Sequence, residues 1–176
     1  MLLNIYVNKF ATITLSREFT YQRVKFYSVT FEDDVSEADK FFEKMEQFAA
    51  EEDSSRFIAL FEEIGNHRGA KERYFRKENA FDAFPPKNKE IKELKLDAFE
   101  PIDNWRLYCL RLSDTIVVLF NGGIKTTDKA LECPQVSPFF RQAEKLTKMI
   151  DEAIKEGDIR ILSDELKIKP KFELML

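Results

Sequence analysis

The feature that most constrains this chain is a pair of apolar segments, residues 105–112 and 115–120, separated only by Ser113 and Asp114. Two residues suffice for the tight turn of an antiparallel hairpin. Residues 116–120 are apolar throughout, which is typical of a central strand covered on both faces. The two segments therefore predict a strand pair inside a sheet, followed by a turn at residues 122–125, Gly-Gly-Ile-Lys.

Strand patterns also flank this pair. Residues 2–15 and 24–31 are rich in β-branched and aromatic side chains, and we expect them to pair. Residues 91–99 predict the first strand of a three-strand meander with the central pair, and residues 159–162 and 172–176 predict short strands. Pro170 excludes a central strand near the end of the chain.

Three helices are predicted. Ser36 with Asp39 three residues later has the pattern of a helix cap, and an apolar stripe follows it. A second helix is expected after Ser54 or Ser55, ending at Gly65. Residues 137–156 carry a long apolar stripe that Gly157 terminates. Residues 66–89 predict a partly helical and then irregular stretch. The pattern as a whole is that of an α+β protein, in which two helices of the N-terminal half and a long C-terminal helix pack against a mainly antiparallel sheet.

Size and composition favour one intracellular domain. A chain of 176 residues with 44% hydrophobic content is long enough to bury one core. No stretch approaches the roughly 20 apolar residues of a membrane span, and the first residues lack the pattern of a signal peptide, so we expect a cytoplasmic protein. Cys109 and Cys133 lie far apart without a partner motif, which predicts neither a disulfide framework nor a zinc site. We expect Cys109 in the core and Cys133 in a loop.

Charge is unevenly distributed along the chain. The formal net charge of −4 argues against a generic nucleic-acid binder, because affinity for phosphate comes from clustered Lys and Arg. Residues 31–65 nevertheless carry twelve acidic and three basic groups, whereas residues 66–95 carry nine basic and five acidic groups. This asymmetry permits a local basic face on an acidic protein, although two solvated helix faces of opposite sign would give the same count.

Several kinds of active site have little support. His67 is the only histidine, so a triad that uses histidine would depend on one residue in a polar stretch. The carboxylates have the spacing of solvated helix faces, and we expect neither a metal nor another cofactor. Residues 121–127 follow an apolar strand as a phosphate loop does, but they lack the spacing that makes a nest of backbone N–H groups.

A basic surface on the sheet is the more specific hypothesis. Side chains alternate between the faces of residues 105–112, so that Arg106 and Tyr108 point the same way. If Lys125 and the basic residues of the preceding segment lie beside them, cations could hold RNA phosphates while an aromatic ring stacks on a base. The alternative is that Tyr108 belongs to the core and the basic groups are scattered over the surface. The residues of this hypothesis are Arg106, Lys125 and Tyr108 as catalytic candidates, with Lys92, Lys95, Arg76 and Arg111 as RNA-binding candidates.

The order of elements resembles a known family. A strand, two helices, a three-strand meander with an Arg early in its middle strand, a Gly-Gly-x-Lys segment and a long helix together resemble the RelE/HigB-like toxins of bacterial toxin–antitoxin pairs. Residues 104–114 and 116–125 look most similar to a phage-related branch of that superfamily, as does the segment Tyr-Phe-Arg-Lys-Glu at residues 74–78 with Phe-Pro-Pro at 84–86.

The resemblance covers residues 24–160 and implies a function. Residues 1–23 would then be an N-terminal strand extension, residues 24–160 a toxin-like core and residues 161–176 a C-terminal tail of one domain. Toxins of this kind cut messenger RNA on the ribosome without a metal and are silenced by a cognate antitoxin, often a helix-turn-helix protein. The resemblance assigns Arg106 to the scissile phosphate and Lys125 to the basic position after the last strand, while Lys92 and Lys95 match more loosely and Tyr108 would act as the acid.

Two other readings of the sequence remain open at this point. The same fold without catalysis could be a protein-binding module that uses its acidic first half, residues 31–65, to hold a basic protein. Alternatively, the chain could be a phage-associated protein that forms a homodimer through its N-terminal strands, because edge strands invite pairing.

Overall fold

The computed structural model describes residues 9–32, 35–94 and 104–176. Its centre is a mainly antiparallel sheet with the strand order β3-β4-β5-β6-β2-β1-β9. The strands of this sheet are β1 (Phe10–Thr20), β2 (Lys25–Phe31), β3 (Arg76–Lys77), β4 (Asp82–Phe84), β5 (Trp105–Arg111), β6 (Ile116–Ile124) and β9 (Leu174–Met175). Neighbouring strands are antiparallel except for β2 and β6, which are parallel. The expected α+β class is therefore confirmed.

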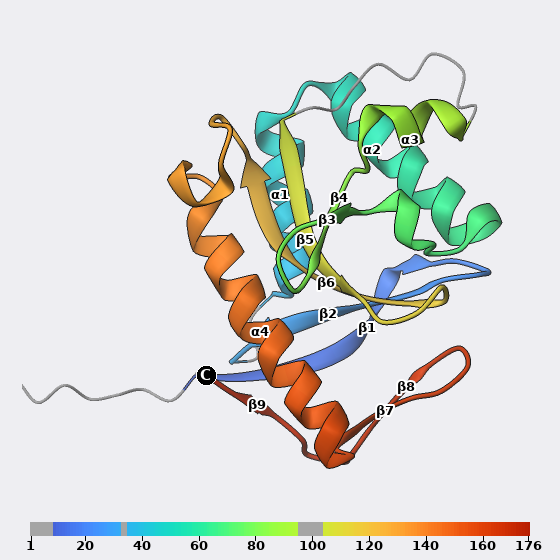
Figure 1. Cartoon of the computed structure of the whole chain (residues 1–176), viewed down its shortest axis with the longest axis vertical. Helices are drawn as coiled ribbons and strands as arrows, with labels where there is room; N and C mark the ends of the chain where they lie inside the picture. Colours follow the sequence, from blue (N-terminus) through green and yellow to red (C-terminus); the bar gives the residue numbers. More distant parts are fainter. Residues whose placement is uncertain (1–8, 33–34, 95–103) are drawn as a thin grey trace, which may run out of the picture.

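Helices cover both faces of the sheet (Figure 1). Helices α1 (Glu37–Phe48) and α2 (Glu51–Glu63) lie on one face, with α3 (Asn88–Glu93). Helix α4 (Ser137–Glu156) crosses the other face, together with the hairpin of β7 (Ile159–Ile161) and β8 (Leu166–Ile168). The sheet thus separates two apolar layers. Among the described residues, no helix is both long enough and apolar enough to cross a membrane.

The predicted hairpin at the centre of the sheet is confirmed. Strands β5 and β6 are antiparallel, and β6 is buried from Ile116 to Gly123 because it has neighbours on both edges and helices on both faces. The alternation of side chains along β5 is also as expected. Tyr108 is buried in the apolar layer between the sheet and α4 (the α4 layer), and Leu107 is buried in the layer between the sheet and α1 (the α1 layer). Cys109 is buried in the core, and Cys133 lies in a loop but is also buried.

The glycines at 122 and 123 do not form the predicted turn, because they lie inside β6. A Cβ atom on Gly122 would lie 1.8 Å from the backbone oxygen of Arg106, and one on Gly123 would lie 3.1 Å from the backbone oxygen of Gln135. At Gly122 only glycine permits this close approach of the backbones, whereas a side chain at Gly123 would require the neighbouring backbone to shift slightly. The pairing register shifts here, because Leu107 faces Gly122 whereas Cys109 faces Leu119. An extra residue of β6 is therefore accommodated as a bulge beside the glycines.

The prediction of a strand at residues 91–99 is wrong for its first part, which belongs to α3, and residues 95–103 lie outside the described residues. Ile91 and Leu94 are three positions apart and both buried, so the apolar pattern here is helical. The outer strand of the meander is instead β4, which pairs antiparallel with β5. It lies within residues 66–89, which predict a partly helical and then irregular stretch.

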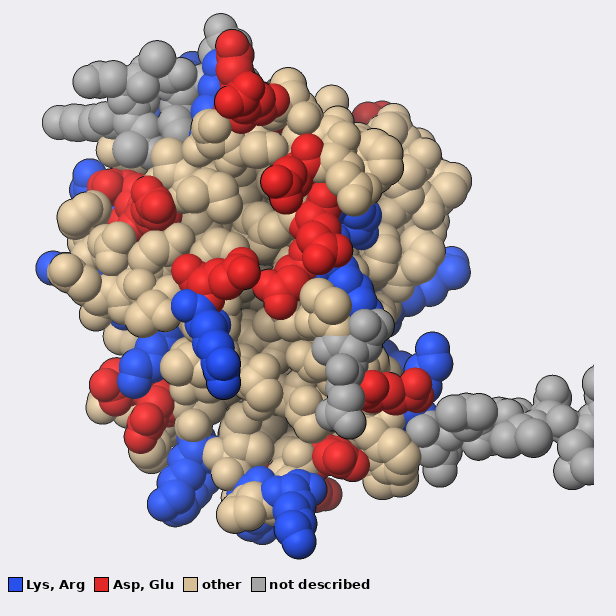
Figure 2. Space-filling model, turned by 180° about the vertical axis from the view of Figure 1, so that it is seen from behind, with Lys and Arg blue, Asp and Glu red and all other residues tan. Residues whose placement is uncertain are grey.

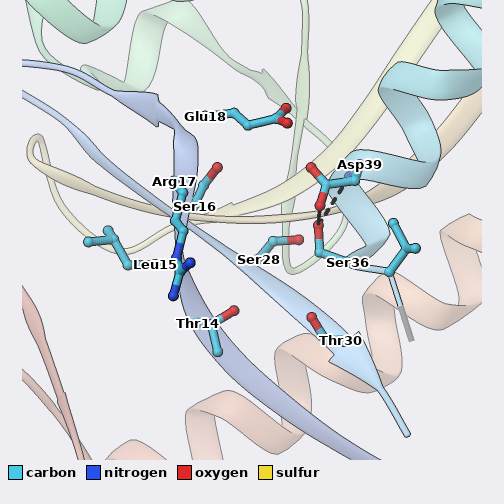
Figure 3. A pocket seen from close by; sticks show the side chains of 10 residues that line it. Thr14, Leu15, Ser16, Arg17, Glu18, Ser28, Thr30, Ser36 and Asp39 are labelled. Carbon is cyan, nitrogen blue, oxygen red and sulfur yellow. Dashed lines mark hydrogen bonds between the residues drawn. The ribbon is translucent and has the colours of Figure 1, made fainter. Parts of the chain in front are cut away.

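Ser36 caps α1 as predicted (Figure 3). Its hydroxyl oxygen accepts a hydrogen bond from the backbone N–H of Asp39 at 3.1 Å, and Ser28 of β2 accepts one from the N–H of Ala38 at 3.1 Å. Both serines line a hollow of about 740 Å³ over β1 and β2. These hydroxyls therefore satisfy two of the free N–H groups at the start of α1.

Helix α2 begins at Glu51, earlier than predicted, so Ser54 and Ser55 lie within its first turns. Three acidic residues in its first turn favour this start because they complement the helix dipole. Gly65 does not end the helix; a π-helical turn continues to Arg68, and Gly69, with φ of 78°, ends it. Gly65 is instead covered by the ring of Tyr21, which a Cβ atom would overlap.

The first and the last described strands join the sheet. The predicted pairing of the first two strand segments is confirmed, with β1 antiparallel to β2 from Ala11 to Thr20; residues 1–8 lie outside the described residues. Helix α4 has the predicted bounds, and Gly157 terminates it with φ of 81°. Strand β9 pairs with the start of β1 at the edge of the sheet, as the position of Pro170 requires. Strand β8 was not predicted.

Candidate functional site

Arg106 and Lys125 come together at the end of the β5–β6 pair. Arg106 faces Gly123 across the strands, and the backbone N–H of Lys125 bonds to the backbone oxygen of Asn104 at 2.6 Å. The guanidinium of Arg106 donates to the backbone oxygen of Trp105 at 2.9 Å, and the residue is 7% exposed. The β hairpin therefore places two of the three predicted catalytic residues in one neighbourhood.

A carboxylate that is not among the predicted site residues completes this neighbourhood. Glu78 is half-buried in the turn between β3 and β4, where its backbone N–H bonds to the oxygen of Phe81 at 3.0 Å. Burial raises the pKa of Glu78 above its ordinary value, while the positive charges of Arg106, Lys125 and Arg76 oppose that rise. We call Arg76, Glu78, Arg106 and Lys125 the Arg106 cluster. The only sequence signal for Glu78 was its place in the segment Tyr-Phe-Arg-Lys-Glu at residues 74–78.

Tyr108 lies beneath this cluster, in the core. Its ring makes edge-on contacts with the rings of Phe81 and Phe140, with centroids 5.6 Å away in both cases. Its hydroxyl is buried and has no hydrogen-bond partner among the described residues. Burial raises the pKa of Tyr108, and the negative charge of Glu78 raises it further. The alternative that Tyr108 is a core residue is therefore correct, and we assign it no contact with a substrate.

Cys133 lies on the same side of the sheet, before α4. Its thiol sulfur accepts hydrogen bonds from the backbone N–H of Thr126 at 3.4 Å and donates toward the side-chain oxygen of Gln135 at 3.2 Å. Burial opposes ionisation, but hydrogen bonds from Thr126, Gln135 and Val136 outweigh it and lower the pKa of Cys133 to about 7. Its burial keeps this thiol from reaching a macromolecular substrate.

The remaining RNA-binding candidates do not gather in one place. Arg76 belongs to the Arg106 cluster, where its guanidinium also donates to the backbone oxygen of Pro85 at 2.9 Å. Arg111 lies at the other end of β5, bonded to the backbone oxygen of Ala70 and to Asp114. Lys92 is exposed on α3, over the opposite face of the sheet, and Lys95 lies outside the described residues. The predicted basic surface is thus reduced to its part around Arg106.

A second polar network lies between α1, β6 and α4. The ammonium of Lys44 donates to the side-chain oxygen of Asn121 at 3.0 Å and to the backbone oxygen of Gly122 at 2.6 Å. The amide of Asn121 donates to the buried carboxylate of Glu37 at 3.0 Å. Burial lowers the pKa of Lys44 to about 8, although the charge of Glu37 opposes this. No sequence pattern indicates this network, because Glu37 and Lys44 lie far along the chain from Asn121.

No group of His, Cys, Asp and Glu side chains suited to a metal ion occurs in the part of the chain that the structure describes. The sequence matches no family model, no curated protein and no solved structure. Two groups of polar residues are therefore candidates for a functional role: the Arg106 cluster and the network of Lys44, Asn121 and Glu37.

Proposed function

We propose that this chain is a toxin-like endoribonuclease that cuts messenger RNA, including ribosome-bound messenger RNA, without a metal ion. The observation that carries the proposal is the Arg106 cluster, in which Arg76, Arg106 and Lys125 lie near the half-buried carboxylate of Glu78. A cognate antitoxin, of the helix-turn-helix class or another, would silence the activity by covering this end of the sheet.

The order of elements supports the same proposal. Strand β2, helices α1 and α2, the antiparallel strands β4, β5 and β6, and helix α4 follow one another as the resemblance to RelE/HigB-like toxins implies. Arg106 lies early in the middle strand of that meander, and Lys125 directly follows its last strand.

The chemistry of the cluster suits transfer within RNA. Glu78 accepts the proton of a 2′-hydroxyl, whose oxygen bonds to the adjacent phosphorus while the bond from phosphorus to the 5′ oxygen breaks. Arg106 and Lys125 stabilise the negative charge that develops on the phosphate, and water supplies a proton to the 5′ oxygen. The hydroxide left by that water takes the proton from Glu78, which returns the carboxylate to its starting state. The products are a 2′,3′-cyclic phosphate and a 5′-hydroxyl end. General-base and electrostatic contributions of this kind each amount to about 10²-fold or more in rate.

Induced expression in bacteria tests the proposal. We expect the wild type to arrest growth and fragment transcripts, and the Arg106→Ala, Lys125→Ala double variant to do neither. The matched control is Lys145→Ala, Lys148→Ala, which removes two exposed cations from α4 and should keep the activity. Intact transcripts in cells that contain folded wild-type protein, without an antitoxin, would contradict the proposal.

A specific observation favours a second candidate function, a protein-binding module. Helices α1 and α2 carry nine acidic and three basic residues, and acidic side chains gather on the face that they cover (Figure 2). An apolar hollow of about 350 Å³ opens between the two helices, and Phe48 beside it is 69% exposed. An apolar hollow with an acidic rim fits a basic segment that carries an apolar anchor.

Charge reversal separates this candidate from the ribonuclease. A Glu43→Lys, Glu46→Lys variant should lose a basic protein partner that the wild type retains in a pull-down, whereas Glu152→Lys, Glu156→Lys on α4 should keep it. RNA cleavage is unaffected by the first pair if the two functions are independent. Failure of the wild type to retain any basic partner would count against the module.

A further inference from the structure

The loop between β6 and α4 folds back onto the end of β6, beside the Arg106 cluster. It covers residues 126–136 and contains a 3₁₀ turn at Ala130–Glu132. The backbone oxygen of Gln135 packs on Gly123, where a Cβ atom would lie only 3.1 Å from it. Gly123 in turn faces Arg106 across the strands. The loop therefore contacts β6 at the place where Arg106 and Lys125 come together.

Cys133 makes several of the contacts between this loop and the end of β6. Its sulfur accepts a hydrogen bond from the backbone N–H of Thr126 at 3.4 Å. Its S–H is within reach of the backbone oxygen of Ile124 at 3.6 Å and of the side-chain oxygen of Gln135 at 3.2 Å. Because Ile124 and Thr126 are the two neighbours of Lys125 in the chain, one side chain contacts the backbone on both sides of that lysine.

Cys133 is itself held in place. It is fully buried in the α4 layer. Its backbone oxygen accepts hydrogen bonds from the N–H groups of Val136 at 3.2 Å and Ser137 at 2.8 Å, at the start of α4. The thiol is therefore fixed relative to both the helix and the sheet, as a group that positions another residue has to be.

Lys125 is a residue that needs such support. Its side chain is partly exposed, and its ammonium is a point charge on a flexible four-carbon stem without a fixed geometry of its own. The backbone N–H of Lys125 bonds to the backbone oxygen of Asn104 at 2.6 Å, on the side of β5. The contacts of Cys133 hold the same backbone from the side of α4, so the direction in which the lysine leaves β6 is set from two sides.

We propose that Cys133 is a positioning residue for Lys125: its thiol holds the backbone on both sides of the lysine and thereby keeps the ammonium within the Arg106 cluster. The contribution of Cys133 to catalysis rests on the proposed ribonuclease function, whereas its effect on the place of Lys125 beside Glu78 does not. Cys133 itself contacts no substrate, because it is buried.

A nuclear magnetic resonance titration of the Glu78 carboxyl group tests the positioning without RNA. The charge of Lys125 opposes the raised pKa of Glu78, so Lys125→Ala should raise this pKa further. Cys133→Ala should raise it by about half as much or more, because the ammonium is no longer held nearby. Cys133→Ser keeps a donor and an acceptor at this position and should leave the pKa of Glu78 unchanged. Because both variants lack the ionisable thiol, the difference between them reflects the hydrogen bonds.

The kinetics of RNA cleavage connect the positioning with the proposed function. Cys133→Ala should lower kcat by about tenfold while KM stays close to that of the wild type, because RNA still binds but the charge that develops on the phosphate is less well stabilised. Cys133→Ser should retain kcat. The matched control is Cys109→Ala, the same substitution at the other buried cysteine, which lies in the α1 layer. It should lower the melting temperature and change neither kcat nor the pKa of Glu78.

The outcomes separate the positioning from the function. Wild-type values of kcat and of the Glu78 pKa in folded Cys133→Ala would overturn the proposal, as would equal changes in Cys109→Ala. Cys133→Ser that behaves as Cys133→Ala does would also overturn it, because hydrogen bonding would then not be the cause. If the wild type cuts no RNA, the ribonuclease function fails, and the titration of Glu78 still decides whether Cys133 positions Lys125.

Discussion

At the scale of single residues, Glu78 is the proposed general base, and its ionised carboxylate also lowers the stability of the folded protein. Its carboxylate is half-buried, and burial raises its pKa despite three nearby cations. The folded protein therefore binds a proton more tightly at this site than the unfolded chain does. Stability from this group is complete below the unfolded pKa and is lost as the pH rises through the folded pKa. At neutral pH an ionised Glu78 is destabilising.

Replacement of Glu78 by Gln should therefore raise the free energy of unfolding at pH 7 and lower RNA cleavage by about 10²-fold or more. Denaturant titrations at pH 7 and at pH 4 give the stability, and the advantage of the variant should shrink at the lower pH. The exposed Glu152→Gln on α4 is the control and should change neither quantity. If Glu78→Gln were less stable and still fully active, the carboxylate would be structural.

Residue identity also decides which features the sequence could reveal. Arg106 and Lys125 stood out because a strand pattern fixed their places in a hairpin, and the hairpin exists. Glu78 did not stand out, because it lies between β3 and β4, which are short strands in a polar stretch without a periodic pattern. The glycine pair was read as a turn because a close approach of two backbones leaves no mark in a single sequence.

At the scale of elements, a capping hydrogen bond is present at the helix start that was predicted correctly, that of α1, and absent at the serine predicted to start α2. Ser36 accepts a hydrogen bond from the N–H of Asp39, whereas Ser55 lies within α2, where its hydroxyl has no capping role. Ser36→Ala should lower the free energy of unfolding by about 1 kcal/mol, because an N–H group of α1 loses its partner.

The same substitution at Ser55 is the matched control for this prediction. Because Ser55 is exposed inside a helix, Ser55→Ala should be neutral or slightly stabilising, as alanine is the better helix former. Denaturant titration of both variants measures the difference. An equal loss at the two positions would contradict the assigned start of α2.

Local patterns predicted β5, β6 and α4 because each is a long segment with a dense apolar run or a helical apolar stripe. They did not predict the parallel pairing of β2 with β6, because these strands are separated by two helices and most of the meander. Nothing in either strand alone identifies its neighbour.

At the scale of the whole molecule, one sheet is shared by two apolar layers, so we expect the layers to unfold together. Trp105, the only tryptophan, packs against Phe41 in the α1 layer, with ring centroids 5.8 Å apart. Leu146 is buried in the α4 layer. Leu146→Ala should cost about 2–5 kcal/mol and shift the Trp105 fluorescence transition as much as the circular dichroism transition. A fluorescence transition that stays in place would show two independent units.

The edge of the sheet bears on the assembly of the molecule. Strand β9 covers β1 only at Phe10 and Ala11, so the rest of that edge is open within the described residues. An open edge permits a homodimer through β1, which sedimentation would detect as twice the mass of one chain. A monomeric mass would exclude this homodimer.

The central claim is that the Arg106 cluster cuts RNA without a metal ion. The most direct measurement is the incubation of purified protein with ribosome-bound messenger RNA in the presence of EDTA, followed by analysis of the new ends. The account predicts fragments with 2′,3′-cyclic phosphate and 5′-hydroxyl ends, formed by the wild type and not by Arg106→Ala, Lys125→Ala. Uncut messenger RNA with folded wild-type protein, or equal cutting by the double variant, would contradict it.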